Sequence, residues 1–317
     1  MEYLKEKEDK EARKILFTGL DMAGKTSIIK SLQREFSKIA ILKPTRGAQR
    51  RIFQFLGRDI SEWDLGGQIS YRISYLKNPS KYFDGTEICI YVIDIQNKPR
   101  IPEALSYLTD VIEQFAKLEI GPPIYVFFHK LDPALMKSAK KEMNHLLLNL
   151  KDKIKNLTDY KKLYFYKTTI YDLSTIITAM SEILLALYPK SELIEKTIEE
   201  FAKKVDAQGV VVLDDNSLII GQYYEDEDIK HILSSSTPYF LTLNDSLKGR
   251  ELGQGTLKDQ ADESMVVQRF GKYFLFKQIS FETETAPYYL LLLKNTPDFK
   301  EEHSESFVSL LKKVLYK

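Results

Sequence analysis

One stretch of eight residues, Gly19-Leu20-Asp21-Met22-Ala23-Gly24-Lys25-Thr26, governs the interpretation of the whole chain. It matches the pattern G-x-x-x-x-G-K-[ST], with a β-type run before it and a helical pattern after it. Backbone N–H groups at the start of such a helix bind phosphate oxygens, helped by the positive end of the helix dipole. We therefore predict a phosphate-binding loop. Its expected nucleotide contacts are Gly19, Asp21, Met22, Ala23, Gly24, Lys25, Thr26 and Ser27.

Two side chains of this loop have specific chemistry. We expect the Lys25 ammonium to span the β and γ phosphates of a nucleotide, and the Thr26 hydroxyl to bind Mg²⁺. The alternative, a glycine turn before an ordinary helix, leaves the match at all defined positions unexplained.

A second motif, Trp63-Asp64-Leu65-Gly66-Gly67-Gln68, ends a later β-type run. We expect Asp64 to hold the magnesium shell, the Gly67 N–H to meet a γ-phosphate, and Gln68 to orient an attacking water. An acid shortly before glycines is also a common strand-ending turn. Its position after the phosphate loop favours the nucleotide interpretation.

Thr45 lies between these two motifs, in Lys43-Pro44-Thr45-Arg46-Gly47. We predict that its hydroxyl closes on magnesium and its amide on the γ-phosphate, so that Lys25, Thr45 and Gln68 are the catalytic candidates. The metal ligands would be Thr26, Thr45 and Asp64. A proline-initiated turn is the alternative for this segment. Arg46 is a candidate arginine finger in cis, although a solvated loop arginine is the simpler interpretation.

The segment His129-Lys130-Leu131-Asp132 predicts the choice of base. A carboxylate at Asp132 can accept hydrogen bonds from N1–H and the N2 amino group of guanine, whereas adenine does not offer these donors. Lys130 would lay its aliphatic stem along the base. His129 stands where most small GTPases have asparagine. After the next strand, the segment that includes Thr168, Thr169 and Ile170 should supply a backbone amide to guanine O6, unless Thr169 is a helix cap instead.

The arrangement of β-type and helical runs predicts two domains. In residues 14–189 six strands alternate with helices, which is typical of a mostly parallel sheet covered on both faces. The strands are expected at 15–20, 51–56, 59–64, 87–94, 123–129 and 163–169, and the helices at 25–36, 101–117, 136–149 and 173–188. A charged lead-in, residues 1–13, precedes this P-loop domain.

Residues 190–317 predict a smaller α/β domain with an antiparallel sheet. A helix at 191–205 leads into a hairpin whose strands, 210–213 and 217–222, flank the polar turn Asp214-Asp215-Asn216. Further strands are expected at 265–270, 273–279 and 288–293, and a helix at 304–316.

Composition excludes several classes of protein. The 46 basic and 45 acidic side chains leave a net charge of +1, which argues against a general nucleic-acid binder. No run approaches the roughly 20 apolar residues of a membrane helix. Glu2 stands where myristoylation needs glycine, and no cysteine is near the C-terminus for prenylation. We therefore expect no direct membrane insertion, and membrane recruitment only through partners. The single cysteine, Cys89, allows no internal disulfide, so we expect a reducing cytosolic compartment.

The sequence resembles the Rag/Gtr GTPases of the Ras superfamily. The motifs that carry the resemblance are Trp63-Asp64 with Gly67-Gln68, the segment 90–94, His129-Lys130-Leu131-Asp132 and the segment 168–172. The histidine of the third motif is characteristic of Rag proteins. The stretches Asp21-Met22-Ala23 and Leu65-Gly66-Gly67 look more Arf-like.

The resemblance implies a guanine-nucleotide switch that slowly hydrolyses GTP to GDP with Mg²⁺. It also implies a roadblock-like C-terminal domain that forms a homodimer or a heterodimer with another Rag-like GTPase, with roadblock or longin proteins as further partners. Two other hypotheses stay open. One is a GTP-occupied scaffold with negligible hydrolysis, and the other is an Arf-like trafficking GTPase.

Overall fold

The computed structural model describes residues 12–251, 264–279 and 287–316. The internal contacts divide the chain into two compact units, which we describe separately. The first comprises Met1–Ser31 and Glu35–Thr175, and the second comprises Leu32–Arg34 and Ile176–Lys317. The charged lead-in expected at 1–13 lies almost wholly outside the described residues. The domain boundary expected at residue 189 stays a prediction.

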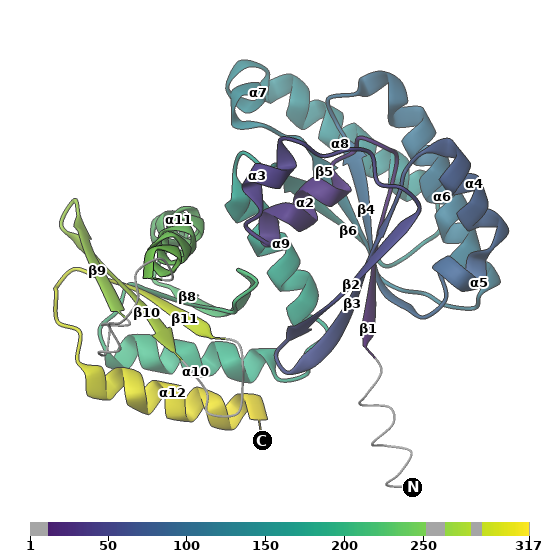
Figure 1. The fold of residues 1–317 in the computed structure, drawn as a ribbon. Coiled ribbons are helices and arrows are strands. Elements are labelled where there is room, and N and C mark those ends of the chain that lie inside the picture. The colour runs from purple at the N-terminus through teal and green to yellow at the C-terminus, as the bar shows by residue number, and fades with distance from the viewer. Residues whose placement is uncertain (1–11, 252–263, 280–286, 317) are drawn as a thin grey trace, which may run out of the picture. The chain divides into compact units, whose positions relative to one another are not determined.

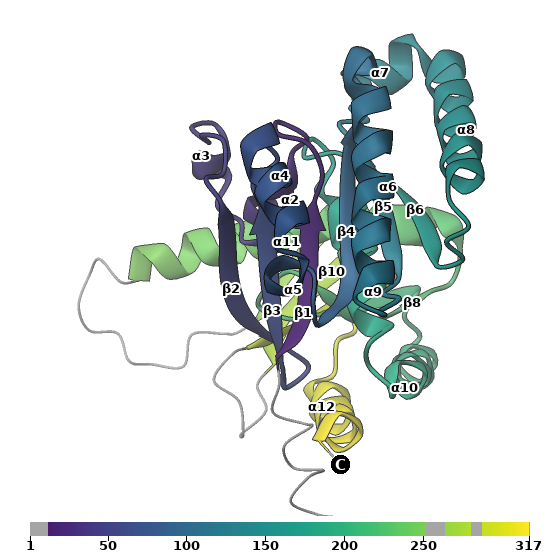
Figure 2. The ribbon, with the colours of Figure 1, turned by 90° about the vertical axis from the view of Figure 1, so that its right-hand side faces the viewer.

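The first unit contains the six-stranded sheet that the sequence predicts. Its strands are β1 (Arg13–Thr18), β2 (Ala48–Phe55), β3 (Arg58–Leu65), β4 (Thr86–Asp94), β5 (Ile124–His129) and β6 (Leu163–Thr168). The strand order is β2-β3-β1-β4-β5-β6, as Figure 2 shows. Only the β2–β3 pair of this sheet is antiparallel, and the other neighbours run parallel. The expectation of a mostly parallel sheet is confirmed.

Helices cover both faces of this sheet. They are α2 (Lys25–Leu32), α3 (Phe36–Ile39), α4 (Ile69–Lys77), α5 (Pro79–Tyr82), α6 (Ile101–Lys117), α7 (Pro133–Ser138) and α8 (Lys140–Leu157), with a 3₁₀ turn at Lys98–Arg100. Helix α9 (Leu173–Leu185) begins in this unit, and its residues from Ile176 onward belong to the second. Figure 1 shows α4, α6 and α8 on one face and α2 on the opposite face. Parallel strands covered in this way bring their carboxyl ends to one edge, where α/β folds bind ligands.

Three predicted helices have different bounds in the structure, and one of them, expected at 173–188, ends at Leu185. The first stops at Leu32 because Arg34 adopts a left-handed backbone conformation (φ 56°), which interrupts the helical hydrogen bonds. The helix expected at 136–149 is divided at Ala139 into α7 and α8, and α8 continues to Leu157.

The core of this unit is centred on β4, whose Ile88–Ile93 segment is buried. Cys89, the single cysteine of the chain, lies in it with a free thiol, and burial raises the pKa of that thiol well above its ordinary value. Next to it, the Tyr91 hydroxyl donates a hydrogen bond to the carbonyl of Ala104 on α6 (2.5 Å). These contacts fix α6 on the sheet.

The second unit has the antiparallel sheet that the sequence predicts. Its elements are α10 (Ser191–Lys204), β7 (Gly209–Leu213), β8 (Ile219–Tyr224), α11 (Glu227–Glu251), β9 (Ser264–Arg269), β10 (Lys272–Ile279), β11 (Tyr288–Lys294) and α12 (Glu301–Tyr316). The strand order is β8-β7-β11-β10-β9, and every neighbouring pair is antiparallel. In the predicted β7–β8 turn, an Asp214 carboxylate oxygen accepts hydrogen bonds from the Asn216 and Leu218 amides.

Two glycines allow helices to pack closely on the two faces of this sheet. A Cβ at Gly209 on β7 would meet Leu233 of α11 at 2.4 Å, and a Cβ at Gly221 on β8 would meet Ile198 of α10 at the same distance. Figure 1 shows α11 on one face and α10 with α12 on the other. Among the residues described, no helix combines the length and the apolar character needed to cross a membrane.

Candidate functional site

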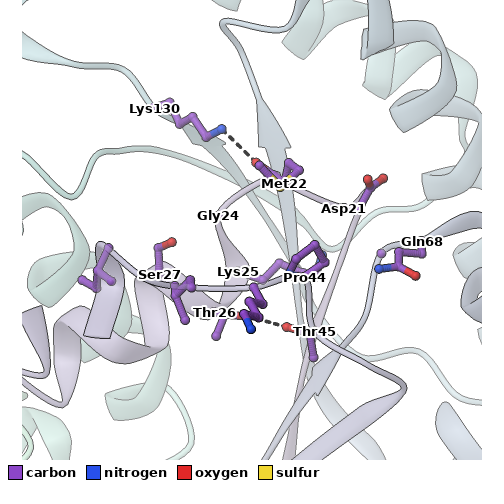
Figure 3. A pocket seen from close by; sticks show the side chains of 14 residues that line it. Asp21, Met22, Gly24, Lys25, Thr26, Ser27, Pro44, Thr45, Gln68 and Lys130 are labelled. Carbon is purple, nitrogen blue, oxygen red and sulfur yellow. Dashed lines mark hydrogen bonds between the residues drawn. The ribbon is translucent and has the colours of Figure 1, made fainter. Parts of the chain in front are cut away.

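The phosphate loop connects the end of β1 to α2 and forms the floor of a cavity of about 230 Å³ (Figure 3). Gly24 has a φ of +102°, and a Cβ there would lie 2.5 Å from the His129 ring. Glycine is therefore the residue that fits. The cavity is lined by Asp21, Met22, Gly24, Lys25, Thr26, Ser27, Ile39, Leu42, Lys43, Pro44, Thr45, Gly67, Gln68 and Lys130.

Lys25 is a buried cation at the base of this cavity. Its ammonium donates hydrogen bonds to the carbonyl oxygens of Gly19 (3.1 Å) and Leu20 (2.7 Å). Burial lowers the pKa of Lys25 to about 8, although the charges of Asp64 and Asp21 oppose this shift. A phosphate oxygen is a stronger acceptor than a carbonyl oxygen, so a bound phosphate can compete for the Lys25 ammonium.

The three expected metal ligands meet beside Lys25. The Thr26 hydroxyl donates to one carboxylate oxygen of Asp64 (2.5 Å), the Thr26 and Thr45 hydroxyls are 2.7 Å apart, and Thr45 lies 3.3 Å from the same carboxylate oxygen. The other oxygen of Asp64 is buried and has no hydrogen-bond partner within the described parts of the chain. One carboxylate and two hydroxyls leave the remaining positions of an octahedron to water and phosphate, as Mg²⁺ prefers. The residues present therefore fit this ion.

The switch segment packs directly on the phosphate loop. A Cβ at Gly67 would lie 2.1 Å from the Asp21 nitrogen, so only glycine allows this approach. The Gly66 amide donates to the Gly47 carbonyl (2.9 Å), which joins this segment to the loop that carries Thr45. Gln68 precedes α4 and lines the cavity, with no side-chain hydrogen bond to the helix start. Arg46 is exposed and lies outside the cavity lining.

The guanine segments form one hydrogen-bonded cluster at the same edge of the sheet. The Lys130 ammonium donates to the Met22 carbonyl (2.8 Å; Figure 3) and to the carboxylate of Asp94 (2.7 Å). Asp132 accepts from the Thr169 hydroxyl on one oxygen (2.6 Å) and from the Gln96 amide on the other (2.7 Å). The second contact is the kind that a guanine N–H donor would make.

Thr169 is therefore bound to Asp132 rather than capping α9, and the Asp172 carboxylate accepts from the Ser174 amide at that helix start. Asp64, His129, Asp132, Thr168, Thr169 and Ile170 do not line the cavity. Neither Asp94 nor Gln96 was predicted as a site residue, although Asp94 belongs to the segment 90–94 that carries the resemblance. Asp94 ends a predicted strand, but nothing in the spacing indicates which lysine it pairs with.

His129 is buried beneath the phosphate loop. Its Nδ1 lies 3.0 Å from the Thr168 hydroxyl, and its ring packs against Gly24. Burial, reinforced by the charge of Lys130, lowers the pKa of His129 to about 4. The side chain is thus neutral in the folded protein at physiological pH.

This burial predicts a pH-dependent stability. The unfolded chain binds a proton at His129 near pH 6.5 but the folded chain only near pH 4, so stability falls as pH decreases through this window. The loss attributable to His129 should reach about 3 kcal/mol below the lower pKa. Thermal unfolding between pH 7 and 4 should show a shallower pH dependence for His129→Asn than for the natural chain. The exposed His145 gives the control, since His145→Asn should keep the steeper dependence. Parallel pH profiles for all three proteins would contradict the assignment.

A phosphate loop, the adjoining Asp64–Gln68 segment and a Lys130–Asp132 pair at the carboxyl edge of one sheet together define a small GTPase of the Ras superfamily. A model of one family within this class, described as the Gtr1/RagA G protein conserved region, matches residues 14–237. The chain therefore belongs to the Gtr1/RagA family.

Curated relatives show both Rag and Arf-like character, as the phosphate loop suggests. ADP-ribosylation factor-like protein 3 of Chlamydomonas reinhardtii is 41% identical over 129 residues, which are 41% of this chain and 67% of the relative. Ras-related GTP-binding protein A of Dictyostelium discoideum is 25% identical over 215 residues, covering 66% of this chain and 68% of the relative. A solved Arl6 small GTPase of Trypanosoma brucei covers 56% of this chain and 97% of its own at 19% identity, with a TM-score of 0.44.

Proposed function

We propose that this protein is a molecular switch that binds GTP and GDP with Mg²⁺ and hydrolyses GTP to GDP and phosphate. The observation that supports this best is the meeting of Thr26, Thr45 and Asp64, because Thr26 and Thr45 line the same cavity as Lys25 and both contact the Asp64 carboxylate. Bound Mg²⁺ would neutralise charge on the β and γ phosphates.

The residues of the chain have separate tasks in this proposal. Lys25 holds the β and γ phosphates, Asp132 selects guanine, and Gly67 contacts the γ-phosphate through its N–H. Gln68 orients the attacking water. Because Gln68 has no competing hydrogen bond at the start of α4, its side chain is available for this task.

We also propose that intrinsic hydrolysis is slow. No arginine is among the described residues that line the cavity, so the charge that develops at the γ-phosphate lacks a cis guanidinium. Without an arginine from a partner, switches turn over at about 10⁻⁴ to 10⁻² s⁻¹, and the upper value belongs to switches that carry an arginine in cis.

The second unit is proposed to pair with another chain, as a homodimer or as a heterodimer with a second Rag-like GTPase. Its sheet has β9 at one edge; Val266 within β9 is 53% exposed, and Phe270 directly after β9 is 90% exposed. An exposed apolar edge of this kind is suited to strand pairing across a two-fold axis. Roadblock or longin proteins are proposed as further partners. We also expect a cytosolic location, from which partners would recruit the switch to membrane surfaces.

Native mass spectrometry of the purified full chain tests both proposals at once. We expect a guanine nucleotide and magnesium to remain bound, and the chain, 36.8 kDa by itself, to be recorded as a dimer. An adenine nucleotide would overturn the role of Asp132. A guanine-loaded monomer would leave the switch intact and contradict homodimerisation, and co-expression with a second Rag-like chain would then test the heterodimer.

A further inference from the structure

A chain of charged side chains runs from the phosphate loop to the switch segment. Asp21 accepts a hydrogen bond from Arg100 (2.7 Å), and Arg100 donates its Nε–H to Glu103 (3.0 Å). The second oxygen of Glu103 accepts from Arg72, and the Nε–H of Arg72 donates to the carbonyl of Gly67 (2.9 Å). The four charged groups thus alternate in sign.

The two ends of this chain of contacts meet. Gly67 already packs its backbone against Leu20 and Asp21, where a Cβ would lie 2.1 Å from backbone atoms of both residues. The contacts therefore form a closed circuit: Gly67 is held on one side by the phosphate loop and on the other by Arg72. Two carboxylates and two guanidiniums sum to zero charge, so the circuit adds no net charge beside the phosphates.

Arg72 is the most constrained member of the circuit. It is only 7% exposed, and its guanidinium lies 5.0 Å from the centre of the Tyr107 ring. A buried cation without its counterion is costly, so Arg72 requires the Glu103 carboxylate. The Gly67 carbonyl that Arg72 holds belongs to the Gly67–Gln68 peptide, and fixing that oxygen fixes the peptide plane from which Gln68 projects.

We propose that Glu103 is a positioning residue for GTP hydrolysis. By bridging Arg72 and Arg100 it holds the Gly67–Gln68 peptide against the phosphate loop, in the orientation that lets Gln68 place the attacking water. This inference rests on the proposed function, since it concerns how Gln68 of the same site is held in position. Small displacements of such a group cost up to about 100-fold in rate.

The test is Glu103→Gln in the full chain. Glutamate offers an acceptor oxygen to each arginine, whereas glutamine offers one oxygen and one NH₂ group, so one guanidinium must lose its partner. The matched control is Glu142→Gln, because Glu142 accepts from Lys98 through one oxygen only (2.6 Å) and is away from Gly67. Glutamine can keep that single contact.

We expect Glu103→Gln to slow single-turnover hydrolysis at saturating GTP by about 10-fold or more, while the Kd for GTP changes much less. Hydrogen exchange of residues 66–72 should become faster in Glu103→Gln and stay at the natural rate in Glu142→Gln. Arg100→Ala should also speed exchange there, although Arg100 does not contact Gly67, because it is the other support of Glu103.

Natural rates of hydrolysis and exchange in Glu103→Gln would overturn the proposal. Faster exchange with unchanged hydrolysis would overturn the positioning role and leave a structural one. If hydrogen exchange of residues 66–72 stayed at the natural rate in Arg100→Ala, the circuit would be reduced to the Arg72–Glu103 pair, and the link to Asp21 would be overturned. Absence of hydrolysis by the natural chain would instead contradict the proposed function, and the exchange measurement would still decide whether Glu103 restrains the switch segment.

Discussion

Asp132→Asn should weaken GTP binding by about 100-fold or more. The carboxylate can accept from both N1–H and the N2 amino group of guanine, and hydrogen bonds to a charged acceptor are each worth about 1.5–3 kcal/mol. Asparagine keeps one acceptor and turns an NH₂ donor toward a donor of the base. The Thr169 hydroxyl donates to one oxygen of Asp132, so an asparagine would keep its oxygen there and direct its NH₂ group toward the base.

The same substitution should favour xanthine nucleotides. Xanthine carries a carbonyl oxygen where guanine has the N2 amino group, so the asparagine NH₂ gains an acceptor. Titration of nucleotide-free protein with GTP and XTP measures both affinities. Asp152→Asn, at an exposed position of α8, is the matched control and should bind GTP as the natural chain does. Undiminished GTP affinity in Asp132→Asn would remove Asp132 from base recognition.

Gln68→Leu should leave GTP binding intact and slow hydrolysis by about 10-fold or more, because leucine cannot orient a water molecule. The fold should tolerate the change, since the Gln68 side chain makes no capping hydrogen bond to α4. Single-turnover phosphate release is the measurement. Gln54→Leu, on an exposed part of β2, is the matched control for loss of a surface amide.

The rate of the natural chain separates the switch from the scaffold hypothesis. A scaffold would release no phosphate with or without Gln68. A natural chain that hydrolyses GTP at the rate of Gln68→Leu would show that another group orients the water.

The phosphate loop and the positions of the strands along the chain could be predicted from sequence because each depends on neighbouring residues. Gly19 to Thr26 form the loop as one contiguous segment, and each buried strand is a short apolar run. Three of the four charged groups in the Asp21-to-Arg72 circuit could not be assigned, since their partners are brought together only by the packing of α4 and α6 on one sheet face. No local pattern contains that information.

Helix α4 was missed because both of its isoleucines face outward. Ile69 and Ile73 are 66% and 48% exposed, whereas the buried residues are Arg72 and Tyr75. The apolar residues of this segment therefore do not form the single buried stripe from which a helix is predicted. The inward face of α4 combines Tyr75, which packs in the core, with Arg72, whose Nε–H donates to the Gly67 carbonyl.

Helix α11 was missed for another reason. Pro238 lies inside it and lacks the N–H that a helix interior requires. Hydroxyls around the proline supply hydrogen bonds to the previous turn: Ser236 donates to the Ile232 carbonyl (2.7 Å) and Thr237 to the Leu233 carbonyl (2.8 Å). Tertiary burial of Leu233 and Leu241 then outweighs the poor helix propensity of the segment.

The burial of Cys89 makes the natural chain a convenient host for site-specific labels. The thiolate is the form that reacts with maleimides, and this thiol is shielded within β4 with a raised pKa, so its labelling should be slow. A cysteine introduced at an exposed residue, such as Leu148 on α8 or Tyr239 on α11, would be the only readily reactive thiol. Fluorophore or spin-label pairs could then follow the chain through its nucleotide cycle without first removing a native residue.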